Sequence, residues 1–262
     1  MTRPRLGDAV VPVFAALGFV FLLVPIAYTV VFSFNDGGKT NLVWQGFSLD
    51  AWANPCGAPR VCEALVGSLQ VGVVSTVVAT ALGTLLAVGL VRGRFRGRGA
   101  LNLLVFLPMA TPEVVLGAAL LSQLLALRLP LGFGTVVVAH VMFCLSFVVV
   151  AVKARVATLD PALEQAAADL YASPWQAFWR VTFPLLLPGI GAAALLAFSL
   201  SFDDFIVTNF TSGGFATFPK FVYVAATRGV PPQANVISSA MFVLALLVVV
   251  LVRLVSRSRR DR

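Results

Sequence analysis

Charged residues are scarce in this sequence. Only 11% of its 262 residues are Asp, Glu, Lys or Arg, whereas an ordinary soluble domain has about 25%. The 19 basic and 11 acidic side chains cannot cover the surface of a soluble domain in which 59% of the residues are apolar. A water-soluble monomer is therefore excluded. The net charge of +8 does not indicate nucleic acid, because the arginines gather in short clusters between apolar runs, which suits anionic lipid headgroups.

Residues that carry out catalysis or bind metals are also few. His140 is the single histidine, and no metal-ligand cluster or nucleophilic triad is visible in the sequence. We expect a chain that is not catalytic alone and binds no metal or cofactor itself. His140 lies inside an apolar run, where it is either a hydrogen-bonded packing residue, which we favour, or a proton relay.

Cysteine is nearly absent, with three residues in the chain. Cys144 lies in an apolar run, whereas Cys56 and Cys62 share the short segment NPCGAPRVC. If this segment faces an oxidising compartment, the two thiols can form a disulfide; the alternative is two free thiols in a loop. We expect the disulfide.

Long apolar runs are abundant. A helix needs about 20 mostly apolar residues to cross roughly 30 Å of hydrocarbon, and six segments qualify. They are residues 10–32, 66–91, 101–127, 131–152, 185–207 and 236–254. The sequence therefore predicts an all-α integral membrane protein that forms a single transmembrane domain, 1–262, with six spans in the lipid bilayer.

The basic residues predict the orientation of these spans. The two termini and the segments after the second and fourth spans hold 14 Lys and Arg residues, and the opposite side holds 5. Because the richer side usually faces the cytoplasm, we expect both termini inside. The segment 153–184 then lies in the cytoplasm, and the segments 35–65 and 209–235 lie outside.

The segment 159–184 reads as two short helices joined by a turn. Asp160 and Pro161 are typical of a helix start, and Ser173 and Pro174 open a second helix, 175–181. The first helix has an apolar face and a polar face. Apolar side chains recur at helical spacing, at Leu163, Ala166, Ala167 and Leu170, and the polar face carries Glu164 and Asp169. Taken alone, this pattern equally fits an amphipathic segment lying on the bilayer surface.

Here the sequence resembles the inner-membrane permease subunits of binding-protein-dependent ABC importers. Their cytoplasmic loop has the form EAA, three residues, G, nine residues, I or V, one residue, L or F, P. The chain matches it with Gln165, Ala166, Ala167, Tyr171, Val181, Phe183 and Pro184. Gln165 replaces the usual Glu, and Tyr171 replaces the usual Gly, so the turn between the helices is expected to differ. We call residues 159–184 the coupling loop.

Within the family the sequence most resembles the second permease subunit of spermidine/putrescine importers, in stretches such as VPIAYTVVFSFND and SLSFDDFIVTNFTSG. The resemblance implies a heterodimer with a sister permease, two ATPase subunits that bind ATP and Mg²⁺, and an external solute-binding protein. It places the ATPase contact in the coupling loop, at Glu164, Gln165, Ala166, Ala167, Asp169, Tyr171, Ala172 and Pro184. Ala166 and Ala167 are expected to sit in a cleft of the ATPase.

Three carboxylates lie within predicted spans, where a charge is costly and usually faces protein or water. Glu113 follows Pro112 in the third span, and Pro108 and Pro112 predict an interrupted helix near mid-membrane. Asp203 and Asp204 lie in the fifth span and point about 100° apart, so one is expected to face a substrate path while the other caps or pairs. The alternative for each is a buried structural pair.

These observations predict a permease subunit for a polyamine-like cation. Another small solute as cargo, or a membrane scaffold without a pathway, remain as alternatives.

Overall fold

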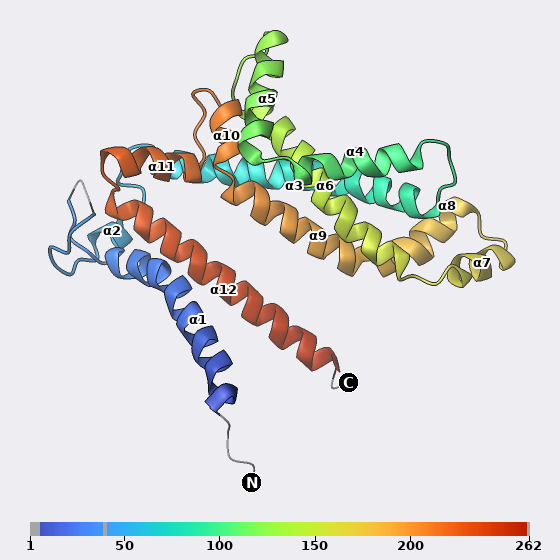
Figure 1. The fold of residues 1–262 in the computed structure, drawn as a ribbon, viewed down its shortest axis with the longest axis horizontal. Coiled ribbons are helices and arrows are strands. Elements are labelled where there is room, and N and C mark those ends of the chain that lie inside the picture. The colour runs from blue at the N-terminus through green and yellow to red at the C-terminus, as the bar shows by residue number, and fades with distance from the viewer. Residues whose placement is uncertain (1–5, 39–40, 261–262) are drawn as a thin grey trace. The chain divides into compact units, whose positions relative to one another are not determined.

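The computed structural model describes residues 6–38 and 41–260, and these residues are mostly helical (Figure 1). The helices in chain order are α1 (Leu6–Phe32), α2 (Asp50–Ala53), α3 (Val61–Arg92), α4 (Arg98–Ala110), α5 (Glu113–Ala126), α6 (Phe133–Ala157), α7 (Ala162–Asp169), α8 (Pro174–Ala177), the π-helix η1 (Phe178–Thr182), α9 (Phe183–Asp203), α10 (Ile206–Thr211), α11 (Phe218–Arg228) and α12 (Pro232–Arg260).

The described helices confirm the predicted all-α membrane architecture. By length and apolar composition, five stretches of helix can cross a membrane, and α4 with α5 provides a sixth if this bent pair counts as one span. The fifth predicted span, 185–207, is not one continuous helix. Its helix ends at Asp203, and a separate short helix, α10, follows.

The chain divides into two compact units, 1–62 with 222–262, and 63–221. In the first unit α1 packs along α12, and the Ser239 hydroxyl donates to the Thr29 carbonyl at 3.4 Å. Most of the large apolar side chains of α1 between residues 11 and 24 are exposed. An apolar surface of this kind on a membrane helix is suited to lipid or to another apolar helix.

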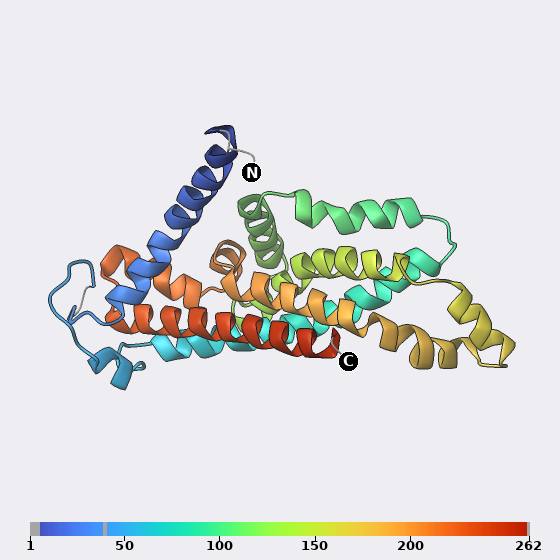
Figure 2. The ribbon, with the colours of Figure 1, turned by 90° about the horizontal axis from the view of Figure 1, so that it is seen from below.

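The core of the second unit lies between α3, α6 and α9. Valines of α6, including Val148 and Val152, are fully buried with Leu90 and Leu186. Small residues on α3 let this helix approach α6 closely. A Cβ atom added at Gly83 of α3 would lie only 2.6 Å from Cγ1 of Val148 on α6. α6 and α9 run side by side in both ribbon views (Figures 1 and 2). This pair forms the scaffold that carries the candidate site.

Candidate functional site

The third predicted span is broken at Thr111 and Pro112, as the sequence predicted, whereas the other predicted breaker, Pro108, lies inside α4 and does not end it. α4 and α5 meet at an angle of 108°, and the turn between them is visible in Figure 2. Thr111 adopts an extended conformation, with φ −84° and ψ 131°, because the proline ring disfavours the helical region for the residue before it. Glu113 is the first residue of α5. Its carboxylate therefore lies where the free N–H groups of a helix favour negative charge.

The fifth predicted span is also broken, and no proline marks the break. Asp204 leaves the helical conformation, with ψ 125°. Its carboxylate accepts hydrogen bonds from the Thr208 amide at 2.8 Å, from the Val207 amide at 3.3 Å and from the Thr208 hydroxyl at 2.8 Å. Asp204 thereby satisfies N–H groups in the first turn of α10 that have no partner within the helix.

The two breaks border one cavity of about 400 Å³, which we call the carboxylate cavity. It is lined by Glu113, Phe143, Ser199, Leu200, Asp203, Asp204, Phe205 and Ile206. Glu113 and Asp203 are exposed. No hydrogen bond or ion pair joins either carboxylate to another described residue. Helices α5 and α10 pack closely beside the cavity, since a Cβ atom at Gly117 would lie 2.5 Å from the Phe210 ring.

His140 occupies the buried interior behind the cavity. Its Nδ1 lies 2.7 Å from the Ser201 hydroxyl, and its Nε2 lies 2.9 Å from the Thr208 hydroxyl and 3.2 Å from Oδ2 of Asp204. The imidazole is fully buried, and the Asp204 side chain is 6% exposed. His140 is thus buried and has a polar partner at each of its ring nitrogens. Of the adjacent pair, Asp204 caps and pairs while Asp203 faces the cavity.

Sequence reasoning missed three polar supports of this site. Ser201 and Thr208 bind the imidazole, and the Lys220 ammonium donates to the Ser212 hydroxyl at 2.6 Å and to the Gly213 carbonyl at 2.8 Å, just after α10. A cation at this end of a helix complements its dipole. The spacing of Asp204 and Thr208, four residues apart at the start of an apolar stretch, was the available signal for the cap.

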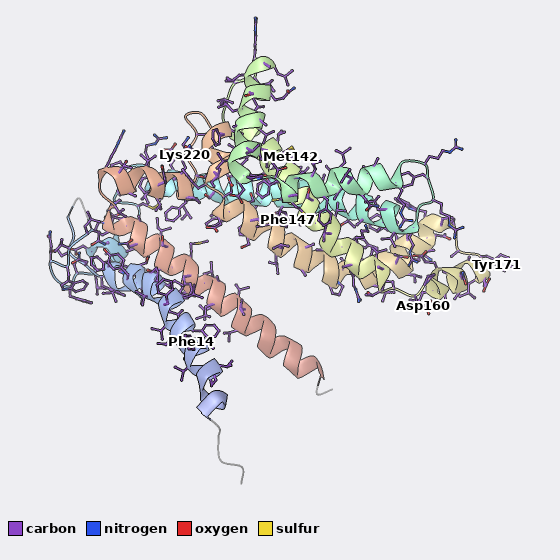
Figure 3. The ribbon with its side chains drawn as sticks, viewed as in Figure 1. Phe14, Met142, Phe147, Asp160, Tyr171 and Lys220 are labelled. Carbon is purple, nitrogen blue, oxygen red and sulfur yellow. A yellow bond between two sulfur atoms is a disulfide. The ribbon has the colours of Figure 1, made fainter. Side chains whose placement is uncertain are left out.

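The coupling loop contains the predicted first helix as α7, with the turn at Tyr171 beyond it (Figure 3). The Ala172 amide donates to the Ala167 carbonyl at 3.0 Å, and the Tyr171 amide donates to the Ala168 carbonyl at 2.9 Å. This is the Schellman pattern, whose residue after the helix cap takes the left-handed conformation. Tyr171 has φ 62°. The turn therefore has the backbone that a glycine at this position favours, although a tyrosine occupies it.

The second helix of the coupling loop differs from the prediction. Ser173 caps α8 through its hydroxyl, which accepts from the Gln176 amide at 3.3 Å. The helix does not end at residue 181, because α8 continues through η1 into α9. Pro184 is the second residue of α9 and directly follows the π-helical segment and Phe183. The coupling loop is thus joined to the fifth span by continuous helix.

The side of α7 that lies against the protein takes one residue from each predicted face, Glu164 and Ala167. Glu164 lies against the protein, with its carboxylate 3.3 Å from Nη2 of Arg92 and 2.9 Å from the hydroxyl of Thr182. Leu170 is 82% exposed. Ala167 is only 9% exposed, so it packs within the coupling loop and is not open to a partner's cleft. The polar contacts of Glu164 hold this side of the helix inward, and Leu163, Ala166 and Leu170 stay exposed.

The remaining members of the coupling loop lie mostly on its surface. Gln165, Ala166 and Asp169 are exposed. Trp175 is 69% exposed and Tyr171 is 98% exposed. Leu170 is exposed as well, and we call these three large exposed side chains the outer face of the coupling loop.

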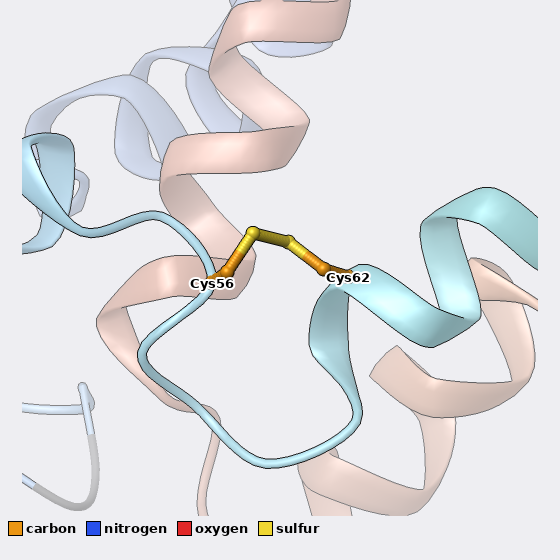
Figure 4. Close-up of a disulfide and its surroundings, with 2 residues drawn as sticks. All are labelled: Cys56 and Cys62. Carbon is orange, nitrogen blue, oxygen red and sulfur yellow. A yellow bond between two sulfur atoms is a disulfide. The ribbon is translucent and has the colours of Figure 1, made fainter.

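The two loop cysteines form the expected disulfide (Figure 4). Cys56 precedes α3, and Cys62 lies in its first turn, with 5.3 Å between their Cα atoms. The bridge closes a very short loop, so it pins the chain locally where α3 begins. Cys144 is free and buried on α6.

Comparisons with known proteins agree with this architecture. Residues 79–261 match the family described as binding-protein-dependent transport system inner membrane component. The spermidine/putrescine transport system permease protein PotC of Haemophilus influenzae is 33% identical over 240 residues, which cover 91% of this chain and 93% of the relative. The putrescine transport system permease protein PotI of Escherichia coli is 34% identical, covering 85% of this chain and 82% of the relative.

Solved structures share the fold at low sequence identity. A chain of a bacterial ABC transporter involved in the import of alginate has a TM-score of 0.66 at 14% identity and covers 96% of both chains. A chain of the MetNI methionine ABC transporter has a TM-score of 0.55 at 18% identity, covering 74% of this chain and 90% of the other. The sequence matches and the shared fold lead to one assignment: the chain belongs to the family of binding-protein-dependent transport system inner membrane components.

Proposed function

We propose that this chain is the permease subunit that forms, with a sister permease, the translocation path of an ATP-driven importer for a polyamine-like cation. The observation that carries the proposal is the carboxylate cavity, where Glu113 and Asp203 approach from two broken helices without a basic partner among the described residues. The names of the relatives PotC and PotI support the choice of cargo. As a member of its family, the chain is a multi-pass protein of the inner membrane.

The cavity has the chemistry that an ammonium group needs inside a membrane. Moving one ammonium into a low-dielectric path without an anion costs several kcal/mol, and two carboxylates offset this cost. The Phe143 ring and the Ser199 hydroxyl, which also line the cavity, can contact a cation or its hydrogens. Two carboxylates among neutral groups suit passage, because a denser acidic site would hold the cation too tightly to release it.

The coupling loop supplies the proposed contact with the ATPase. The outer face, made by Leu170, Tyr171 and Trp175, is apolar and exposed, as expected of a surface that a partner covers. ATP and Mg²⁺ would bind to the partner ATPase pair. Closure of that pair would move the coupling loop, and α6 and α9 would follow, because α7 lies between them in the chain and α8 runs on into α9.

The remaining partners follow from the predicted orientation. The side richer in basic residues, which includes the coupling loop, faces the cytoplasm. An external solute-binding protein would deliver the cation to the opposite side.

Neutralising the carboxylates tests the proposed function. Glu113→Gln and Asp203→Asn keep side-chain size and remove charge, and Asp50→Asn, a carboxylate that does not line the cavity, is the matched control. In vesicles that contain the assembled importer and its binding protein, each cavity variant should lower spermidine uptake about tenfold or more, since a lost charge-assisted contact is worth roughly 1.5–3 kcal/mol. The control variant should transport like the wild type.

Three outcomes would contradict the proposal in different ways. Wild-type spermidine uptake in both single variants and in the double variant would show that the carboxylates are structural. ATP-dependent uptake of another solute, with none of spermidine, would select a different cargo. Absence of any uptake that requires the ATPase and the binding protein would favour a membrane scaffold.

A further inference from the structure

The two adjacent aspartates of the fifth span have different surroundings, although the sequence gives them the same side chain. The Asp204 carboxylate is buried and accepts from two amides and the Thr208 hydroxyl, with the imidazole of His140 beside it. Asp203 is exposed to the carboxylate cavity. The negative charge of Asp204 is therefore compensated within the protein, whereas the charge of Asp203 is left for a ligand.

His140 contacts Asp204 from a different helix, α6. A carboxylate can only accept, so the Nε2 proton of His140 is directed at Oδ2 of Asp204 and at the neighbouring Thr208 hydroxyl. The opposite ring nitrogen is fixed by Ser201. The imidazole on α6 thus joins the end of α9 to the start of α10.

Rotation of Asp204 toward the cavity would break this arrangement. The Thr208 amide and Nε2 of His140 would then lose their acceptor in a buried position, which is costly. The backbone turns at Asp204, and this turn sets where α9 ends and hence where Asp203 is presented.

We propose that His140 is a positioning residue that holds Asp204 as the cap of α10, so that Asp203 is the member of the pair presented to the cation. This inference rests on the proposed function, because it assumes that a cation enters the carboxylate cavity. His140 does not line the cavity itself. Its effect on transport is exerted through the backbone turn between α9 and α10.

The test compares three variants around the imidazole in the assembled importer with spermidine as the probe. His140→Leu removes both ring nitrogens. Thr208→Val replaces threonine by a residue of similar shape and removes one hydrogen-bond donor to Asp204. It provides the test if the His140→Leu variant does not assemble. His140→Gln keeps an N–H donor near Asp204. Cys144→Ala, one helical turn from His140 and bonded to the Ala197 carbonyl, is the control for packing between α6 and α9.

His140→Leu and Thr208→Val should raise the half-saturating spermidine concentration about tenfold, the scale expected for a lost charge-assisted hydrogen bond. His140→Gln should stay within about threefold of the wild type, and Cys144→Ala should match it. In an Asp203→Asn background neither His140→Leu nor Thr208→Val should raise the half-saturating concentration further, because the residue that they position is no longer charged.

A general packing role predicts a different pattern. The proposal is overturned if the His140 and Asp203 effects multiply in the double variant, or if the variants lower only the amount of assembled complex and leave the half-saturating concentration unchanged. If Asp203→Asn and Glu113→Gln themselves transport spermidine normally, the proposed function fails first and the positioning role falls with it. If the carboxylate variants lose uptake while the His140 and Thr208 variants keep wild-type half-saturation, only the positioning role fails.

Discussion

Tyr171 allows a direct test of the backbone of the coupling loop. Its φ of 62° lies in the left-handed region, which costs a residue other than glycine roughly 1–2 kcal/mol. The side chain is 98% exposed and so contributes almost no packing within the chain. Tyr171→Gly removes this strain. It also gives the unfolded chain more backbone freedom, which reduces the gain in stability by roughly 0.5–1 kcal/mol. We expect a net stabilisation of the coupling loop by about 1 kcal/mol.

Hydrogen exchange measures this change locally. One kcal/mol corresponds to about a fivefold change in an opening equilibrium, so the amides at the end of α7, including that of Ala172, should exchange about fivefold more slowly in the purified permease in lipid nanodiscs. Ala172→Gly is the matched control. Ala172 is not among the residues with positive φ, so a glycine there should only destabilise. If Tyr171→Gly accelerates exchange as the control does, the tyrosine side chain stabilises the coupling loop by more than the backbone strain destabilises it.

The same variant separates stability from partner binding. If the Tyr171 ring contacts the ATPase, Tyr171→Gly should weaken association of the two proteins while the coupling loop itself becomes more stable. Equal affinity for the ATPase in wild type and variant would place the ring outside the contact.

Three further predictions concern orientation, packing and the disulfide. Reporter fusions after Arg96 and after Lys220 should read inside and outside respectively, and the opposite result would refute the orientation drawn from the basic residues. Ala167→Arg should unfold α7, because Ala167 is only 9% exposed and overpacking costs about 1–3 kcal/mol. Faster proteolysis of the coupling loop would show this unfolding, and unchanged resistance to proteolysis would contradict it. Replacing both Cys56 and Cys62 by Ser should remove about 2 kcal/mol of local stability, seen as faster hydrogen exchange at the start of α3, with spermidine uptake retained; a loss of uptake would show that the disulfide also shapes the transport path.

The sequence alone was sufficient for the features that depend on neighbouring residues. The apolar runs predicted the membrane helices, because spanning hydrocarbon requires only length and low polarity. Pro112 predicted the break in the third span, since a proline restricts the residue before it wherever it occurs. The spacing of the coupling-loop motif predicted the family, which residues 79–261 confirm.

Only the tertiary structure decided the features that depend on distant residues. The break at Asp204 has no proline, and beyond its local cap bonds the carboxylate contacts His140, which lies 64 positions earlier in the chain. The helical pattern of α7 did not show which side chains would lie against the protein; Glu164 turns inward because Arg92 and Thr182 offer it partners there. Periodicity records which side chains share a face of a helix. Which face is buried, and which of two adjacent aspartates stays free, depends on polar partners that the chain brings together only when it folds.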